Sequence, residues 1–211
     1  MSGVNRYYGN CKPSQDTSNN NLKVPKDWMD CPSMAALSVA NSFITFKTPL
    51  DDKYNHKIAI VKRFNPQMVF SYMCSYQESI GLWIDLTNTT RYYSKIEVEN
   101  MGCAYVKMPC VGHGDLPNWQ VVEMFLEICY NFLKNNFSQH IGVHCTHGFN
   151  RTGFLIVSYL IEVLNYDVTS AIQHFAAARP PGIYRQNYIN ELYRRYSNEA
   201  PTIAPKPHWI H

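Results

Sequence analysis

Two kinds of hydrophobic pattern alternate along this chain. Short apolar runs rich in β-branched and aromatic residues predict strands at 43–46, 82–86, 104–108 and 141–143. Apolar side chains at helical spacing predict helices at 66–76, 119–133, 154–164, 168–178 and 188–196. Because strands and helices alternate, we predict an α/β fold in which helices flank both faces of a central, mostly parallel sheet.

Local sequence features predict where several of these helices begin and end. Asn65 precedes Pro66, a pair typical of an N-cap followed by the first helical position. We expect Gly81 to end that helix, and Asn118 and Asp167 to cap two later ones.

Composition divides the 211 residues into three parts. Residues 1–23 are polar and poor in aliphatic side chains, so we expect a disordered tail. Residues 24–198 form one predicted catalytic domain, which is long enough to bury a sizeable core. Residues 199–211 are proline-rich and predict an extended linker, which suggests that a further domain follows.

The most informative stretch joins the strand at 141–143 to the helix at 154–164. Cys145 follows the strand, and five residues separate it from Arg151. A tight loop before a helix directs backbone N–H groups at an anion, and these dipoles together with Arg151 favour the thiolate of Cys145. Arg151 can grip two phosphate oxygens, and Thr152 can donate to the thiolate or the loop. The predicted phosphate-binding positions are Thr146, His147, Gly148, Phe149, Asn150 and Thr152.

This arrangement predicts nucleophilic attack by Cys145 on phosphorus through a cysteinyl-phosphate. The alternative is a buried structural cysteine beside a surface arginine, which the flanking strand and helix disfavour. A zinc site built from Cys145, His144, His147 and His113 is also disfavoured, because a metal would repel the Arg151 guanidinium in the same loop. We therefore expect no metal and no other cofactor.

Overall composition says more about the cellular compartment than about the function. The net charge of +3 is compatible with an anionic substrate but too small to indicate nucleic-acid binding. No apolar run has the length of a membrane span, and the first residues do not resemble a secretory signal. Seven cysteines without framework spacing favour a reducing compartment, the cytosol or the nucleus.

The loop and its flanks resemble the cysteine-dependent phosphatase superfamily, which implies a sheet of about five strands. Further segments resemble the RNA 5′-triphosphatase domain of metazoan mRNA capping enzymes. In order they are Asp27-Trp-Met-Asp-Cys-Pro32, Phe46-Lys-Thr-Pro-Leu50, Asp85-Leu-Thr-Asn-Thr-Thr-Arg-Tyr-Tyr93, Gly112-His-Gly114, His144-Cys-Thr-His-Gly-Phe-Asn-Arg-Thr-Gly153 and Ala178-Arg-Pro-Pro-Gly-Ile-Tyr184.

That resemblance implies removal of the γ-phosphate from 5′-triphosphate RNA, the first step of mRNA capping, in the nucleus. It also implies a guanylyltransferase domain on the C-terminal side and RNA polymerase II as partners. No Lys-x-Asp-Gly motif occurs, so the guanylyltransferase half is absent from these 211 residues. We expect a monomer with no membrane attachment. The alternatives are a stand-alone RNA tri- and diphosphatase, a dual-specificity protein phosphatase on the same fold, or a catalytically silent phosphate-binding module.

The need for a general acid depends on the leaving group. A tyrosine has a pKa of about 10 and a phosphate second ionisation lies near about 6, so a triphosphatase gains little from a proton donor. Asp115 lies about where related phosphatases hold such an acid, although an acid in a turn is the simpler interpretation. Asp85, at the end of a buried strand, is the third catalytic candidate beside Cys145 and Arg151, or else has a structural hydrogen-bonding role.

Binding of the RNA chain requires contacts beyond the loop. Arg91 and Arg185 are our candidates for RNA phosphates, with Lys95, Lys107 and Arg179 as further possibilities and Tyr92, Tyr93 and Tyr184 available for stacking. A metal-dependent triphosphatase would need several Glu-x-Glu strands, and only Glu97 and Glu99 form such a pair, in a segment more typical of a solvated helix or turn.

Overall fold

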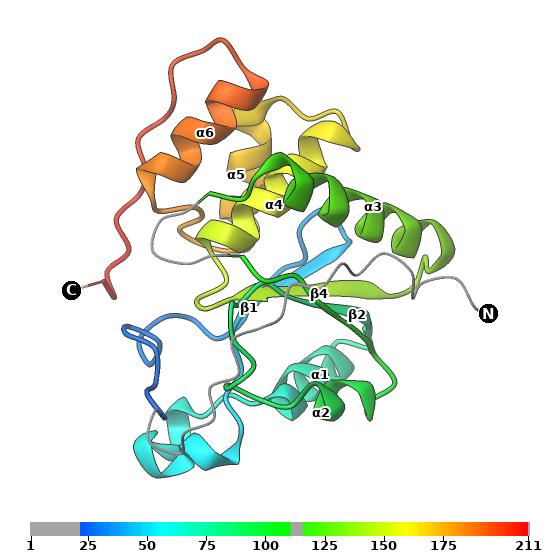
Figure 1. The fold of residues 1–211 in the computed structure, drawn as a ribbon, viewed down its shortest axis with the longest axis vertical. Helices are drawn as coiled ribbons and strands as arrows, with labels where there is room; N and C mark the ends of the chain where they lie inside the picture. The colour runs from blue at the N-terminus through cyan, green and yellow to red at the C-terminus, as the bar shows by residue number, and fades with distance from the viewer. Residues whose placement is uncertain (1–21, 111–115, 211) are drawn as a thin grey trace.

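Strands and helices alternate in the computed structural model of this protein, which describes residues 22–110 and 116–210 (Figure 1). The elements in chain order are β1 (Phe43–Lys47), η1 (Asp52–Lys57), η2 (Ile60–Lys62), α1 (Pro66–Ser75), β2 (Ile80–Asp85), α2 (Lys95–Glu99), β3 (Ala104–Lys107), α3 (Trp119–Asn135), β4 (His140–Cys145), α4 (Asn150–Glu162), α5 (Val168–Ala178) and α6 (Gln186–Tyr196). Residues 1–21 of the expected disordered tail, His113 and Asp115 lie outside the described residues.

The sheet of the described chain has four strands, all parallel, in the order β1-β4-β2-β3. The resemblance implied about five. Residues 33–39 lie beside β1 where a fifth strand would lie, but they pair with it only through two isolated antiparallel bridges, Met34 with Phe46 and Val39 with Phe43. The α/β fold class is confirmed, with a sheet slightly smaller than expected.

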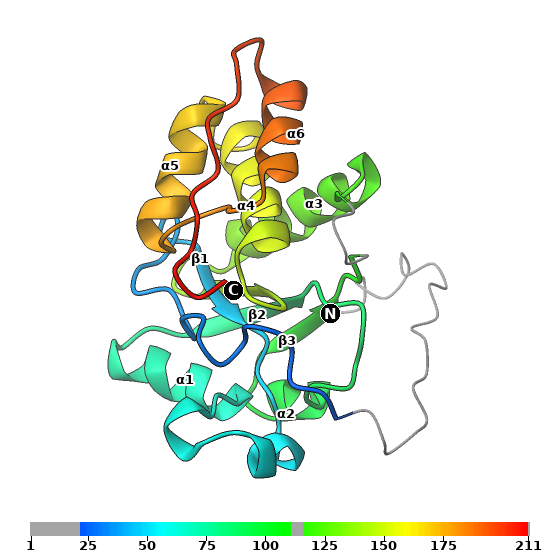
Figure 2. The ribbon, with the colours of Figure 1, turned by 90° about the vertical axis from the view of Figure 1, so that its left-hand side faces the viewer.

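Helices cover both faces of this sheet. Helices α3 to α6 lie on one face, and α1, α2 and the short η1 and η2 lie on the other (Figures 1 and 2). In β2, Leu82 and Ile84 belong to the core beneath α3 to α6, whereas Trp83 points into the core on the opposite side. Burial on both faces explains why these strands are apolar almost without interruption.

The three predicted helix N-caps are confirmed. The side chains of Asn65, Asn118 and Asp167 accept hydrogen bonds from the N–H groups three residues on, at 3.0, 3.0 and 2.9 Å. These bonds satisfy N–H groups that have no partner within the helix.

The expected role of Gly81 was wrong. Helix α1 already ends at Ser75, and Gly81 lies inside β2. A Cβ at this position would come within 2.4 Å of the Gln139 side chain and 2.8 Å of Phe132. This glycine therefore lies inside a strand, under the ends of the Gln139 and Phe132 side chains, and does not end a helix.

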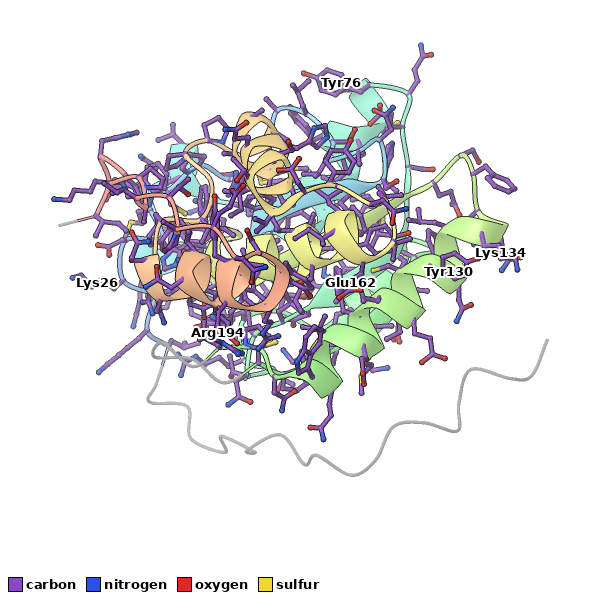
Figure 3. All side chains as sticks on the ribbon, turned by 90° about the horizontal axis from the view of Figure 1, so that it is seen from above. Lys26, Tyr76, Tyr130, Lys134, Glu162 and Arg194 are labelled. Atoms are coloured by element: carbon purple, nitrogen blue, oxygen red, sulfur yellow. The ribbon has the colours of Figure 1, made fainter. Side chains whose placement is uncertain are left out.

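Helix α4 is the most enclosed helix among the described residues. Every residue from Thr152 to Leu160 is buried, because α3, α5 and α6 pack around the helix. Figure 3, seen from above, shows Glu162 near the end of α4, with Tyr130 of α3 on one side and Arg194 of α6 on the other. A helix confined in this way gives the loop at its N-terminus a fixed support.

Within residues 22–110 and 116–210, no helix combines the length and apolar character that crossing a bilayer requires.

Candidate active site

The site lies where the central strand ends. Because all four strands are parallel, their carboxyl ends share one edge, and the register pairs Cys145 with Lys47, and Asp85 with both His144 and Lys107. The loop 146–149 leaves β4 here and leads directly into α4. Ligands of open α/β sheets bind at this edge.

The loop provides N–H groups for an anion. Within the described residues, no acceptor pairs with the N–H groups of Thr146, His147 or Phe149, and the first N–H groups of α4 have no partner within the helix. Together with the partial positive charge of the helix N-terminus, they form a cradle that suits a phosphoryl group.

Cys145 is held toward the thiolate at the base of this cradle. Burial alone would raise the pKa of Cys145, but the charge of Arg151, the Thr152 hydroxyl and the N–H groups of Thr152 and Gly148 outweigh burial and lower it. The Thr152 hydroxyl is buried and has no other partner among the described residues, so it is available to the sulfur. The thiol therefore has the character of a nucleophile.

Arg151 is fixed before any ligand binds. Its Nη1 donates to the carbonyl oxygens of Leu86 and Cys110 at 3.2 and 3.1 Å, and its Nη2 donates to Thr146 Oγ1 at 2.8 Å. A guanidinium has five N–H groups, so some remain that no described residue uses. They can bind equatorial oxygens of a phosphoryl group without a further loss of side-chain entropy.

Several predicted substrate-binding residues support the loop with their side chains. His147 contacts the Lys26 carbonyl oxygen at 2.8 Å, and Asn150 Oδ1 accepts from the N–H groups of Tyr184 and Arg185, both at 3.0 Å. The Phe149 ring is fully buried. These residues can therefore meet a ligand through their backbone, while their side chains anchor the loop to distant segments.

Gly148 is required by the path of the loop. Its φ is +75°, and a Cβ would lie 2.2 Å from the carbonyl oxygen of Phe46. The backbone of β1 thus lies directly against the loop, and only glycine fits between them.

Asp85 lies in a buried polar cluster beside the site. Its carboxylate accepts hydrogen bonds from Thr87, from Tyr105 at 2.8 Å and from Lys107 at 2.8 Å. Burial would raise the pKa of Asp85, but the charge of Lys107 and the hydrogen bonds from Lys107 and Thr87 lower it. Asp85 is therefore an ionised acceptor, which favours a structural hydrogen-bonding role over proton donation.

Tyr93 connects this cluster to the residue that precedes the nucleophile. Its hydroxyl lies 3.2 Å from Asp85 Oδ2 and 2.6 Å from His144 Nε2. His144 Nδ1 in turn lies 3.2 Å from the carbonyl oxygen of Cys145. Burial lowers the pKa of His144 to about 4, so its ring is neutral at neutral pH and Lys107 provides the positive charge next to Asp85.

The candidate residues for RNA contacts differ in how exposed their side chains are. Arg185 is exposed and Arg91 is half-buried, with its guanidinium 5.1 Å from the centre of the Tyr92 ring. Arg179 is 1% exposed and donates to the carbonyl oxygens of Pro32 and His147, so it supports the loop and cannot reach RNA. The same correction applies to the stacking role considered for Tyr92 and Tyr93, which are buried.

Sequence reasoning missed Lys47. Its ammonium is buried 3.7 Å from the centre of the Trp28 ring and donates to the carbonyl oxygens of Trp28 and Cys31. Burial lowers the pKa of Lys47 to about 8. Only the resemblance of its segment to capping enzymes singled it out in the sequence. Within the described ranges, no group of three His, Cys, Asp or Glu side chains is arranged to hold a metal ion.

Comparison with known proteins agrees with this geometry. Residues 66–198 match the family model described as "Dual specificity phosphatase, catalytic domain". The chain belongs to this family. It is 44% identical to the mRNA-capping enzyme of Danio rerio over 187 residues, covering 88% of this chain and 31% of that relative. It is 37% identical to the RNA/RNP complex-1-interacting phosphatase of Mus musculus, covering 96% of this chain and 62% of the relative.

Solved structures of phosphatases share the fold at much lower identity. One example is a kinase associated phosphatase, which is 17% identical with a TM-score of 0.59 and covers 77% of this chain and 92% of the other. The chain spans about a third of the length of the mRNA-capping enzymes that it matches. The dual specificity phosphatase domain is thus shown for this chain, whereas substrate and partners are matters for proposal.

The first prediction concerns Gly148. Gly148→Ala should lower kcat/KM for any phosphate ester about 100-fold, because the loop must move away from the Phe46 carbonyl oxygen and misplace its N–H groups. Gly102→Ala is the matched control, since Gly102 has a φ of +77° with nothing within 4 Å of a new Cβ. It should cost only about 1–2 kcal/mol of stability. Equal losses of activity in the two variants would show that the contact between the new Cβ and the Phe46 carbonyl oxygen is not the cause.

The second prediction concerns the charge on Cys145. Alkylation of Cys145 by iodoacetamide, followed by peptide mass spectrometry, should have its pH midpoint below the ordinary cysteine value of about 8.5. Because Arg151 lowers the pKa, Arg151→Ala should move this midpoint upward. Arg194→Ala, at an exposed arginine on α6, should leave it unchanged. An unshifted midpoint in Arg151→Ala would show that Arg151 does not stabilise the thiolate.

Proposed function

We propose that this protein is an RNA 5′-triphosphatase that removes the γ-phosphate of nascent mRNA, the first step of capping. The observation that carries the proposal is a thiolate and a fixed guanidinium around a loop of N–H groups, in a chain 44% identical to an mRNA-capping enzyme over 88% of its length. The loop accounts for phosphoryl transfer, and the extent of the similarity favours triphosphate RNA as the substrate.

The reaction proceeds in two steps. Cys145 Sγ attacks the γ-phosphorus, an S–P bond forms, and the bond to the bridging oxygen breaks as diphosphate-ended RNA leaves with the electron pair. Loop N–H groups and Arg151 stabilise the equatorial oxygens. Water then attacks the phosphocysteine, its protons pass to the released phosphate and solvent, and the thiolate is regenerated.

The state of Asp85 agrees with this substrate. A diphosphate leaving group has a pKa about four units below that of tyrosine, a difference of about 5 kcal/mol in proton affinity. Expulsion of such a group does not require a proton donor. Asp85 is held ionised, so we assign it to positioning of Tyr93, His144 and the loop. Arg91 and Arg185 remain our candidates for binding the following phosphates.

A second candidate function comes from the other relative. This chain is similar over 96% of its length to a relative named as an RNA/RNP complex-1-interacting phosphatase. The second candidate is therefore a stand-alone RNA phosphatase that acts on both triphosphate and diphosphate ends. Under the first proposal, the partners are triphosphate RNA, a guanylyltransferase domain and RNA polymerase II, and the site of action is the nucleus.

The third prediction separates these functions. With γ-labelled triphosphate RNA, the protein should release labelled phosphate, stop at the diphosphate end and keep its activity in excess EDTA. Cys145→Ser should abolish release with the fold intact, and Cys74→Ser, at an exposed cysteine of α1, should not affect it. Conversion to monophosphate would support the second candidate, whereas turnover by Cys145→Ser or its loss in EDTA would rule out the thiol mechanism.

The fourth prediction tests the assignment of Asp85. Asp85→Asn should lower kcat about tenfold, equivalent to about 1.4 kcal/mol, because the Lys107 charge loses its partner and His144 loses its support. The factor should be similar for aryl phosphates whose leaving groups differ in pKa. A loss that grows with the pKa of the leaving group would instead identify Asp85 as a proton donor.

A further inference from the structure

The segment after α6 returns to the catalytic loop. It contains no helix or strand, yet Trp209 is only 3% exposed, between the exposed residues His208 and Ile210. Figure 2 shows this segment running down across the layer of α4 and α5, and Figure 1 shows it descending on the outer side of α6 to about the level of the sheet. A segment that served only to connect two domains would not need to bury its largest side chain against one of them.

The partner of Trp209 is part of the phosphate loop. The centres of the Trp209 and Phe149 rings are 5.2 Å apart, and Phe149 is the residue that caps α4. Cys31 and Tyr184 complete the same buried cluster. The guanidinium of Arg179 lies 4.3 Å from the centre of the Phe149 ring and also donates to the His147 carbonyl oxygen. Several side chains therefore contact Phe149 from different sides, and Trp209 is one of them.

The C-terminal segment, residues 199–210, is attached to the domain at a second point. Gln186, the first residue of α6, donates to the Thr202 carbonyl oxygen and accepts from the Ala204 N–H, each at 2.8 Å. Pro205 and Pro207 then stiffen the chain between this attachment and Trp209. A stiff segment attached at Gln186 loses less conformational entropy when Trp209 docks.

We propose that Trp209 is a positioning residue of the active site, and that residues 199–210 form part of the catalytic unit. By packing on Phe149, Trp209 keeps the loop N–H groups directed at the phosphoryl group. A one-ångström shift of such groups is costly in phosphoryl transfer. The proposal rests on the loop binding a phosphoryl group, as proposed above, but does not depend on RNA being the substrate.

The fifth prediction tests Trp209 with tungstate as the phosphate-like probe, measured by calorimetry on the full chain. Trp209→Ala should bind tungstate roughly fivefold more weakly and raise the pH midpoint of Cys145 alkylation. Trp209→Phe should restore both, because it keeps an aromatic ring on Phe149. Ile203→Ala is the matched control, since Ile203 lies in the same segment but is 91% exposed.

The two readouts distinguish positioning from stability alone. If Trp209 only stabilises the fold, Trp209→Ala should lower the melting temperature but leave the tungstate affinity and the alkylation midpoint unchanged. That result would overturn the proposal. If Trp209→Ala does not fold, Gln186→Ala decides, because it releases the tail without emptying the core. It should weaken tungstate binding in the same direction, and unchanged binding would overturn the proposal. If the unmodified protein does not bind tungstate, the loop assignment itself fails.

Discussion

The lowered pKa of the Cys145 thiol is the feature on which the rest of the site depends. A buried thiol would ordinarily keep its proton, and here Arg151, Thr152 and the N–H groups of the loop reverse that preference. The same groups then stabilise the charge that develops on a phosphoryl group, so one arrangement both prepares the nucleophile and assists the reaction. This double use requires a loop whose backbone does not move.

The loop is supported by contacts from several elements. Helix α4 is confined within its layer, β1 lies against Gly148, and Arg179 joins the loop to the segment around Pro32. The side chains of the loop also contact other segments. His147 contacts Lys26, Asn150 contacts Tyr184, and the Phe149 ring is buried. In this phosphatase the loop side chains therefore maintain the shape of the loop, and its backbone is left to bind the ligand.

A second constraint is the buried polar cluster around Asp85. Its carboxylate is ionised in the interior, which is tolerated because Lys107, Thr87 and Tyr105 satisfy it. Through Tyr93 the cluster reaches His144, next to the nucleophile. We assign this network to positioning the end of β4, a role that does not involve proton transfer. This agrees with a leaving group of low pKa and connects the architecture to the proposed triphosphatase reaction.

Reading the sequence was enough to predict the α/β class, the strand–loop–helix unit of Cys145 and Arg151, and the caps at Asn65, Asn118 and Asp167. These features depend on residues close together in the chain, whose spacing carries the physical information. The folded arrangement was needed to show that Arg179 and Lys47 are buried supports, that Gly81 belongs to a strand, and that Trp209 packs on Phe149. Those outcomes depend on which distant segments meet, and on the free energy of burying a charge or a ring in that particular place, which no local pattern specifies.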